Sequence, residues 1–347
     1  MKRKAKKRKL TPVGKLMVVI LVLLPTVLIC TRCIGSKKAA AKTAVSSVSN
    51  KKTVKSILNP IFENRDVMSY AEITADTKKL NIKSKNGILI DTVNHKVIAE
   101  KHGDTKIYPA SMTKVMTLIV AVENIKNLDD TFTVTNEIID PLIEEEASRA
   151  GFDPGEKVTV RDLLYGAILP SGADATIALA DYVAGSEREF VELMNKKVNK
   201  MGLKNTHFMN SSGLHDEFHY STPHEMALIM EYAIKNETCK KILSTYQYTT
   251  SKTEQHTDGI ELYSTMFSRM YGNEAETVSI IAGKTGYTTE GGNCLVSYAE
   301  NESGGKYVLV TTDATGSYMP IYDAIDAYAE NVGNGKTNIV KEQVDNF

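Results

Sequence analysis

The feature that most constrains this 347-residue chain is a serine and a lysine spaced three apart where an apolar helical pattern begins. Ser111 and Lys114 both lie in the stretch Tyr108–Lys114. Apolar residues then recur at helical spacing over Val115–Val122. Positions i and i+3 share a helix face, so the amine is expected within reach of the hydroxyl. Pro109 blocks backward extension and places Ser111 in the first turn, where free N–H groups and the helix dipole favour a developing anion. A hydroxyl needs an adjacent base to become a nucleophile, and this spacing supplies one.

The spacing alone is weak support for a nucleophile. Ser-x-x-Lys is expected about once by chance in a chain of this length. It also occurs elsewhere in the chain, for example as Ser49–Lys52 in a polar stretch. Other parts of the chain must therefore distinguish Ser111 from a chance match.

The formal net charge is zero, but its distribution is lopsided. Eight Lys and Arg residues and no acid occupy positions 1–15, and the apolar run Leu16–Cys30 follows. A basic stretch before an apolar run predicts membrane targeting, with the basic side in the cytoplasm. No clean cleavage site follows, so a retained anchor is favoured over a cleaved signal, and either one puts the folded domain outside the cytoplasm. Nothing beyond this tail indicates nucleic-acid binding.

The composition divides the chain into four parts. Residues 1–35 are the basic N-terminus with the membrane anchor or signal, and residues 36–70 are a flexible linker rich in Lys, Ala and Ser. Residues 71–332 form one large domain, and residues 333–347 are a C-terminal tail.

The apolar periodicity predicts strands at both ends of the domain and helices between them. The expected strands are Gly87–Asp91, Lys96–Glu100, Val278–Ala282, Asn293–Ala299 and Lys306–Thr312. The expected helices are Arg161–Leu169, Ala175–Val183 capped by Asp174, Glu187–Met201, Pro223–Ile234 and Tyr318–Val332. This order predicts an α+β fold in which the first hairpin and the last strands share one sheet.

Two further motifs strengthen the interpretation of Ser111. Ser171-Gly172-Ala173 is expected in a loop between two helices, and Lys284-Thr285-Gly286 is expected at the end of the Val278–Ala282 strand. The order Ser-x-x-Lys, Ser-x-Asn-like, Lys-Thr-Gly is typical of penicillin-recognising serine enzymes.

From about Asn86 to Ala329 the chain resembles the serine D-alanyl-D-alanine carboxypeptidases, which are the low-molecular-mass penicillin-binding proteins. Stretches between the motifs carry the resemblance too: Gly155–Val158, Leu163–Tyr165, Leu169–Gly172, His219–Thr222 and Lys284–Thr288. The resemblance implies a β-lactamase/transpeptidase-like α+β fold, with an antiparallel sheet flanked by helices and an inserted all-helical subdomain. It implies removal of the terminal D-Ala from peptidoglycan stem pentapeptides, inhibition by β-lactams, and no cofactor or metal. It implies a place on the outer face of the bacterial cytoplasmic membrane.

The family's catalytic roles fall on three side chains. Ser111 would attack the carbonyl between the two terminal D-alanines, and Lys114 would take its proton. The nearby cation Lys284 should lower the pKa of Lys114, so that its amine is neutral. Ser171 would relay a proton to the leaving amine.

The family's substrate-binding roles fall mainly on one strand. Lys284 and Thr285 would hold the terminal carboxylate, and the missing side chain of Gly286 would let the substrate lie along the strand edge. The backbone N–H groups of Ser111 and Tyr287 would form the oxyanion hole. Arg269, upstream of the strand, is a further candidate for attracting the carboxylate.

The chain departs from the family pattern at Ala173, where Asn is usual. A methyl group cannot bridge Lys114 and the substrate amide, and losing one such contact costs about 1–3 kcal/mol of transition-state binding. The departure leaves a second hypothesis open, a weak or inactive homologue that binds peptidoglycan or penicillin without turnover.

Three other patterns have simpler interpretations. The segment His215–His219 differs from a His-Glu-x-x-His zinc helix because the acid after the first histidine is Asp and a loop is expected there. Glu192–Asn195 is one residue too short for the Glu-x-x-x-Asn loop of class A β-lactamases. Cys239 and Cys294 are expected as small buried apolar side chains.

Overall fold

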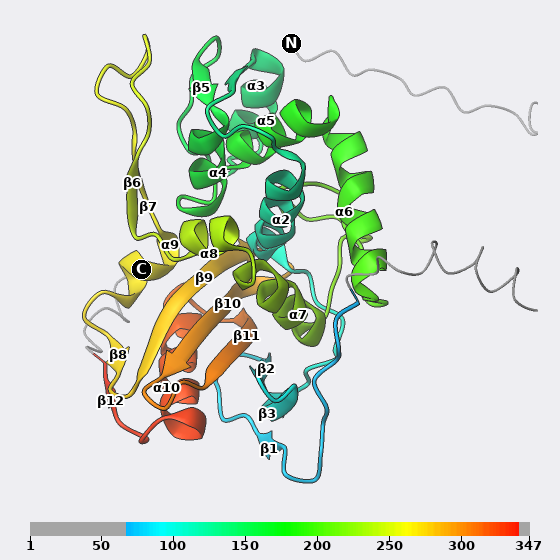
Figure 1. The fold of residues 1–347 in the computed structure, drawn as a ribbon, viewed down its shortest axis with the longest axis vertical. Coiled ribbons are helices and arrows are strands. Elements are labelled where there is room, and N and C mark those ends of the chain that lie inside the picture. The colour runs from blue at the N-terminus through cyan, green and yellow to red at the C-terminus, as the bar shows by residue number, and fades with distance from the viewer. Residues whose placement is uncertain (1–66, 340–347) are drawn as a thin grey trace, which may run out of the picture. The chain divides into compact units, whose positions relative to one another are not determined.

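An eight-stranded sheet is the centre of the described structure, a computed structural model that describes residues 67–339 (Figure 1). The strands lie in the order β1-β3-β2-β11-β10-β9-β8-β12, and every pair is antiparallel except β1 with β3. Their bounds are β1 Lys78–Lys79, β2 Asn86–Asp91, β3 Lys96–Lys101, β8 Glu274–Ala275, β9 Val278–Thr288, β10 Gly292–Asn301, β11 Lys306–Ala314 and β12 Thr337–Asn338.

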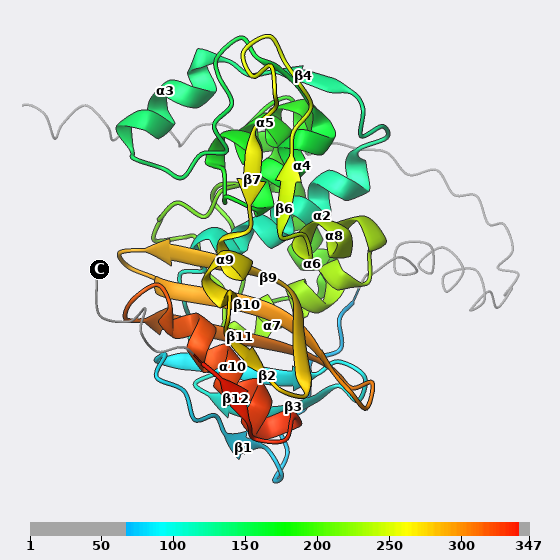
Figure 2. The same cartoon turned by 90° about the vertical axis from the view of Figure 1, so that its left-hand side faces the viewer.

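Side chains alternate between two cores along the central strands, as strand geometry requires. Ile88 and Ile90 of β2 enter the larger core, and Leu89 between them enters the smaller one. Helix α10 (Met319–Val332) packs on the smaller core, and α7 (Pro223–Ile234) packs on the opposite face (Figure 2). The sheet is therefore covered on both sides, which explains why β2 is buried along its whole length.

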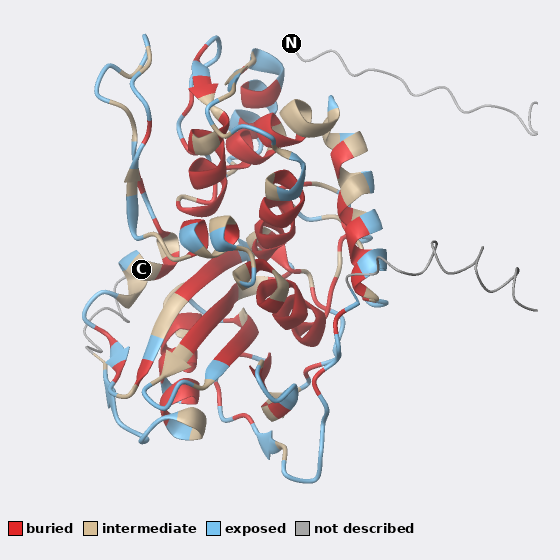
Figure 3. Cartoon of the chain, viewed as in Figure 1, coloured by how far each residue is buried: buried red, intermediate tan, exposed pale blue. Residues whose placement is uncertain are grey.

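The chain segment that follows β3 and precedes β9 is mainly helical. Its central helix α2 (Lys114–Asn124) is almost fully buried, as Figure 3 shows. The other helices here are α3 Asn136–Glu144, α4 Val160–Ile168, α5 Ala173–Ala184, α6 Glu187–Met201, α8 Glu237–Leu243 and α9 Thr265–Met270. Two small sheets accompany them, β4 Thr131–Thr133 with β5 Lys157–Thr159, and β6 Gln247–Thr249 with β7 Glu261–Tyr263.

The α+β fold and the shared sheet are confirmed, and the helices 187–201 and 223–234 end where the sequence predicts. Two expectations were wrong in detail. β9 continues to Thr288, so Lys284-Thr285-Gly286 lies inside the strand rather than after it. Asp174 does not cap α5, because the helix begins at Ala173, two residues before the expected start, and the Asp174 carboxylate accepts hydrogen bonds from another segment.

Three expectations concern membranes and cysteines. The predicted membrane segment Leu16–Cys30 lies outside the described residues. Within residues 67–339, no helix combines the length and the apolar character that crossing a bilayer needs. Cys239 and Cys294 are both buried free thiols, as expected.

Candidate active site

The Ser111–Lys114 pair forms as expected, although the local helix type differs. Pro109 precedes a short 3₁₀ turn, η2 (Ala110–Thr113), and α2 starts only at Lys114. Ser111 therefore lies in a tight turn ahead of the α-helix. The Lys114 Nζ donates to Ser111 Oγ at 3.0 Å and to the carbonyl oxygen of Ser212 at 2.5 Å. A base is thus directly hydrogen-bonded to the candidate nucleophile.

Ser171 and Lys284 form a second serine–lysine pair. The Lys284 Nζ donates to Ser171 Oγ at 2.9 Å and to the carbonyl oxygen of Thr285 at 2.8 Å. The Thr285 hydroxyl lies 2.6 Å from that of Thr265 at the start of α9. Ser171 has a positive φ of 68°, a conformation that costs free energy in a residue with a side chain and is often found at functional sites. The Lys284–Ser171 hydrogen bond thus links the Ser171-Gly172-Ala173 motif to the Lys284-Thr285-Gly286 motif.

Gly286 brings the two pairs together. A Cβ placed on Gly286 would lie 3.0 Å from the Ser111 backbone nitrogen and 3.2 Å from that of Met112. Strand β9 therefore runs directly against the nucleophile turn, at a separation that any larger residue would widen. The backbone at Tyr287, the next residue along β9, is thereby brought to the neighbourhood of Ser111, and the tyrosine side chain is 63% exposed.

Burial controls the charge of both lysines. It lowers the pKa of the Lys114 amine to about 7, against the opposing effect of the Asp174 and Glu187 carboxylates. The pKa of Lys284 is also lowered well below its usual range, first by burial and then by the charges of Lys114 and Arg269. The expected lowering at Lys114 is confirmed, but its cause is desolvation rather than repulsion by Lys284.

Arg269 lies in the last turn of α9, and burial lowers the pKa of its guanidinium group. Its effect on Lys284 places it in the electrostatic neighbourhood of the second pair. The predicted site residues thus lie on η2, α2, β9 and just before α5, and Arg269 lies on α9, which packs against β9.

Asp174, beside the second motif, has a structural role that its sequence position does not reveal. Its buried carboxylate accepts hydrogen bonds from the backbone N–H groups of Ala150 at 2.8 Å and Gly151 at 3.1 Å. The Ala173 N–H donates to the carbonyl oxygen of Ser148 at 2.7 Å. These bonds attach residues 148–151 to the second motif. The only signal in the sequence was an acidic residue beside Ala173, which we interpreted as a helix cap.

The alternative patterns have structural roles. His215–His219 lies in a loop rather than on a helix, and the two rings have different partners, Glu290 for His215 and Thr113 for His219. Asn195 lies on α6 and exchanges two hydrogen bonds with the backbone of Phe208, at 2.8 and 3.0 Å. Neither arrangement supplies the zinc helix or the β-lactamase loop.

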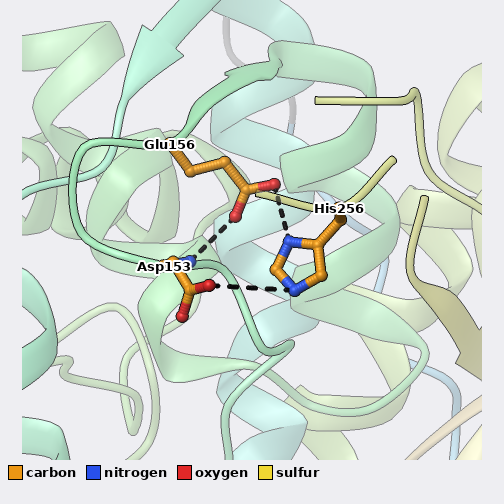
Figure 4. Close-up of side chains that lie close together, drawn as sticks. All are labelled: Asp153, Glu156 and His256. Carbon is orange, nitrogen blue, oxygen red and sulfur yellow. Dashed lines mark hydrogen bonds and ion pairs between the residues drawn. The ribbon is translucent and has the colours of Figure 1, made fainter. Parts of the chain in front are cut away.

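Within residues 67–339, Asp153, Glu156 and His256 form a group whose ligand atoms lie close enough to hold a metal ion (Figure 4). Both Glu156 oxygens already accept hydrogen bonds, from Asp153 N at 2.8 Å, Thr253 Oγ1 at 2.7 Å and His256 Nδ1 at 3.0 Å. These bonds attach the β6–β7 hairpin tip to the turn before β5, which gives the group a structural role.

Comparisons with known proteins agree with this geometry. Residues 72–316 match the family model of D-alanyl-D-alanine carboxypeptidases. The D-alanyl-D-alanine carboxypeptidase DacF of Bacillus subtilis is 34% identical over 234 residues, which cover 65% of this chain and 56% of DacF. The D-alanyl-D-alanine carboxypeptidase of Streptomyces strain K15 is 36% identical over 251 residues, which cover 70% of this chain and 84% of that protein.

Solved structures give the same result. The crystal structure of the Streptomyces K15 DD-transpeptidase matches with a TM-score of 0.64 at 31% identity, covering 72% of this chain and 96% of that chain. Penicillin binding protein 5 from Haemophilus influenzae matches with a TM-score of 0.65 at 27% identity, covering 75% and 72%.

The fold is the β-lactamase/transpeptidase fold of DD-peptidases, and the two serine–lysine pairs lie within it. Because the family model covers residues 72–316, the chain belongs to the D-alanyl-D-alanine carboxypeptidase family. The chain spans only about half the length of some curated relatives, 56% of DacF for example.

Proposed function

We propose that this protein is a D-alanyl-D-alanine carboxypeptidase that removes the terminal D-Ala from peptidoglycan stem pentapeptides. The observation that carries the proposal is the hydrogen bond between Lys114 and Ser111, with β9 and the Ser171–Lys284 pair directly beside it. The test is release of D-alanine from a pentapeptide that ends in D-Ala-D-Ala by the wild-type protein. No release would contradict the proposal and favour a homologue that only binds.

We assign a group of this chain to each step of the proposed reaction. Ser111 Oγ attacks the carbonyl carbon between the two D-alanines, and its proton passes to the Lys114 Nζ. The backbone N–H groups of Ser111 and Tyr287 bind the resulting oxyanion, each contributing about 3 kcal/mol if typical. The C–N bond then breaks as the Ser171 hydroxyl passes a proton to the leaving amine and takes up the proton held by Lys114. Water then attacks the ester on Ser111, its proton passes through Lys114 to the Ser111 oxygen, and the shortened stem peptide is released.

Lys284 and Thr285 bind the terminal carboxylate in this proposal, with Arg269 adding long-range attraction. The carboxylate restores the positive charge of Lys284, because an adjacent anion favours the charged form of an amine. β-Lactams, which present a carboxylate beside a reactive amide, acylate Ser111 through the same groups. No cofactor takes part.

We also propose that the domain, residues 71–332, acts on the outer side of the cytoplasmic membrane. The N-terminal segment would hold it there, and residues 36–70 would act as the spacer. This proposal rests on the basic residues that precede the apolar run Leu16–Cys30.

The acylation rate should rise with pH and level off above about 8. Burial lowers the pKa of Lys114 to about 7, and only the neutral amine can accept the Ser111 proton. Below that pKa the rate constant should fall about tenfold per pH unit. The measurement is the second-order rate constant for acylation by penicillin from pH 5 to 9, and a flat profile over that range would contradict Lys114 as the base.

Replacing Ala173 with asparagine should raise the acylation rate. Ala173 is the first residue of α5 and lies two residues after Ser171. By resemblance to the family, we expect an amide at this position to bridge the Lys114 amine and the substrate. One such contact is worth about 5- to 160-fold in rate. Ala173→Leu is the matched control, since leucine has a similar size and no amide. Equal rates for the two variants would show that the missing asparagine does not limit catalysis.

A further inference from the structure

The segment between α6 and α7, residues 202–222, contacts the nucleophile turn and the start of α2 along their length. The backbones of Ser221 and Ile107 are hydrogen-bonded, and Gly213 lies directly against the backbone of Ala110. The ring of His219 is hydrogen-bonded to the Thr113 hydroxyl. The backbone carbonyl oxygens of Ser212 and Ser211 accept hydrogen bonds from the side chains of Lys114 and Thr117. The reaction proposed above uses none of these side chains except Lys114. One of them, His219, is a buried titratable group without an assigned role.

The hydrogen bonds of His219 define its protonation state. Its side chain is buried, with 2% of the residue exposed, and its Nδ1 accepts the backbone N–H of Met209 at 3.1 Å. A neutral imidazole that accepts at Nδ1 carries its proton on Nε2. The Nε2–H therefore donates to Thr113 Oγ1, 2.7 Å away. Thr113 is fully buried too, so an unpaired hydroxyl there would be costly.

The imidazole also stays uncharged. Burial lowers the pKa of His219 to about 4, and Lys114, His207 and His215 act in the same direction against Asp216. A neutral donor at this position fixes the turn without adding a positive charge beside the Lys114 amine. A lysine or arginine in its place would fill the same space with a cation.

We propose that His219 is a positioning residue for the Ser111–Lys114 pair, acting through its hydrogen bond to Thr113. Thr113 is the residue where the 3₁₀ turn meets α2, and the pitch at this junction sets the separation of Ser111 Oγ from the Lys114 Nζ. Ser111 precedes Thr113 by two residues and Lys114 follows it by one. Loss of the bond frees the junction to change pitch, and the base then moves out of line with the hydroxyl.

The inference rests on the proposed function, and the test separates the two. The non-covalent affinity for penicillin and the acylation rate constant are measured for the wild type and for His219→Leu and His219→Gln. His219→Leu should lower the acylation rate constant at least tenfold and leave the affinity within about twofold. His219→Gln, whose amide N–H reaches the position of Nε2–H, should keep the rate constant within about threefold of the wild type.

Thr113→Val gives a second route to the same bond, which matters if His219→Leu does not fold. Valine keeps the shape of threonine and removes the hydroxyl, so its rate loss should match that of His219→Leu. The double variant should lose no more than either single variant, because both remove one interaction. Additive losses, or a wild-type rate in either single variant, would overturn the positioning role. Failure of the wild type to acylate would instead overturn the proposed function.

Discussion

Replacing Ser111 with alanine should reduce D-alanine release by about 10⁴-fold or more. Without the hydroxyl no acyl-enzyme can form, and the Lys114 amine has no proton to accept. The substrate-binding groups on β9 remain, so the affinity for the peptide should change little. The measurement is kcat and KM for a D-Ala-D-Ala peptide.

The chain contains its own control for this prediction. Ser49 and Lys52 repeat the Ser-x-x-Lys spacing, so Ser49→Ala should leave kcat and KM unchanged. If Ser49→Ala lost activity and Ser111→Ala kept it, the assignment of the nucleophile would be wrong. Retained activity in both variants would point to a mechanism without a serine nucleophile.

Replacing Lys114 with methionine should lower the acylation rate constant by about 10²–10⁴-fold, the usual contribution of a positioned general base. Methionine has a similar length and no amine, so Ser111 loses its proton acceptor while the buried volume is kept. Lys114→Arg should be as inactive, because a guanidinium group stays protonated at neutral pH. A rate within threefold of the wild type in Lys114→Met would exclude this amine as the base.

Lys114→Met should also have a larger free energy of unfolding than the wild type. Burial lowers the pKa of Lys114 from its usual 10.5 to about 7, so below about pH 10 the unfolded chain holds this proton more tightly than the folded protein does. Folding therefore costs free energy at neutral pH and below, and methionine removes that cost. The melting temperature of Lys114→Met should exceed that of the wild type at pH 7. A catalytic loss together with a gain in stability distinguishes a functional residue from a structural one.

The three motifs could be predicted to meet because each has a local signal and the resemblance supplies their relation in space. The helices 187–201 and 223–234 could be predicted because their apolar periodicity is a local signal. Their N-termini lie where Ser186 and Thr222 cap them through their own side chains. Both caps are short-range features that stand in the sequence next to the helices they start.

The remaining features depend on distant contacts. β9 continues past Ala282 by pairing with β10, and Gly283 and Gly286 lie close against Val296 and the Ser111 turn in this extension. In the sequence alone, glycines at these positions indicate the end of a strand. The roles of Asp174 and His219 likewise depend on Ala150 and Thr113, which lie 24 and 106 residues away. The Lys114 pKa shift comes mainly from burial, which no spacing of charges in a sequence reveals.

The most direct test of the central claim is the intact mass of the wild-type protein after treatment with penicillin, followed by peptide mapping of the product. The account predicts a gain of one penicillin mass, located on the peptide that contains Ser111 and absent from Ser111→Ala. An unchanged mass, or an adduct on any other residue, would contradict it.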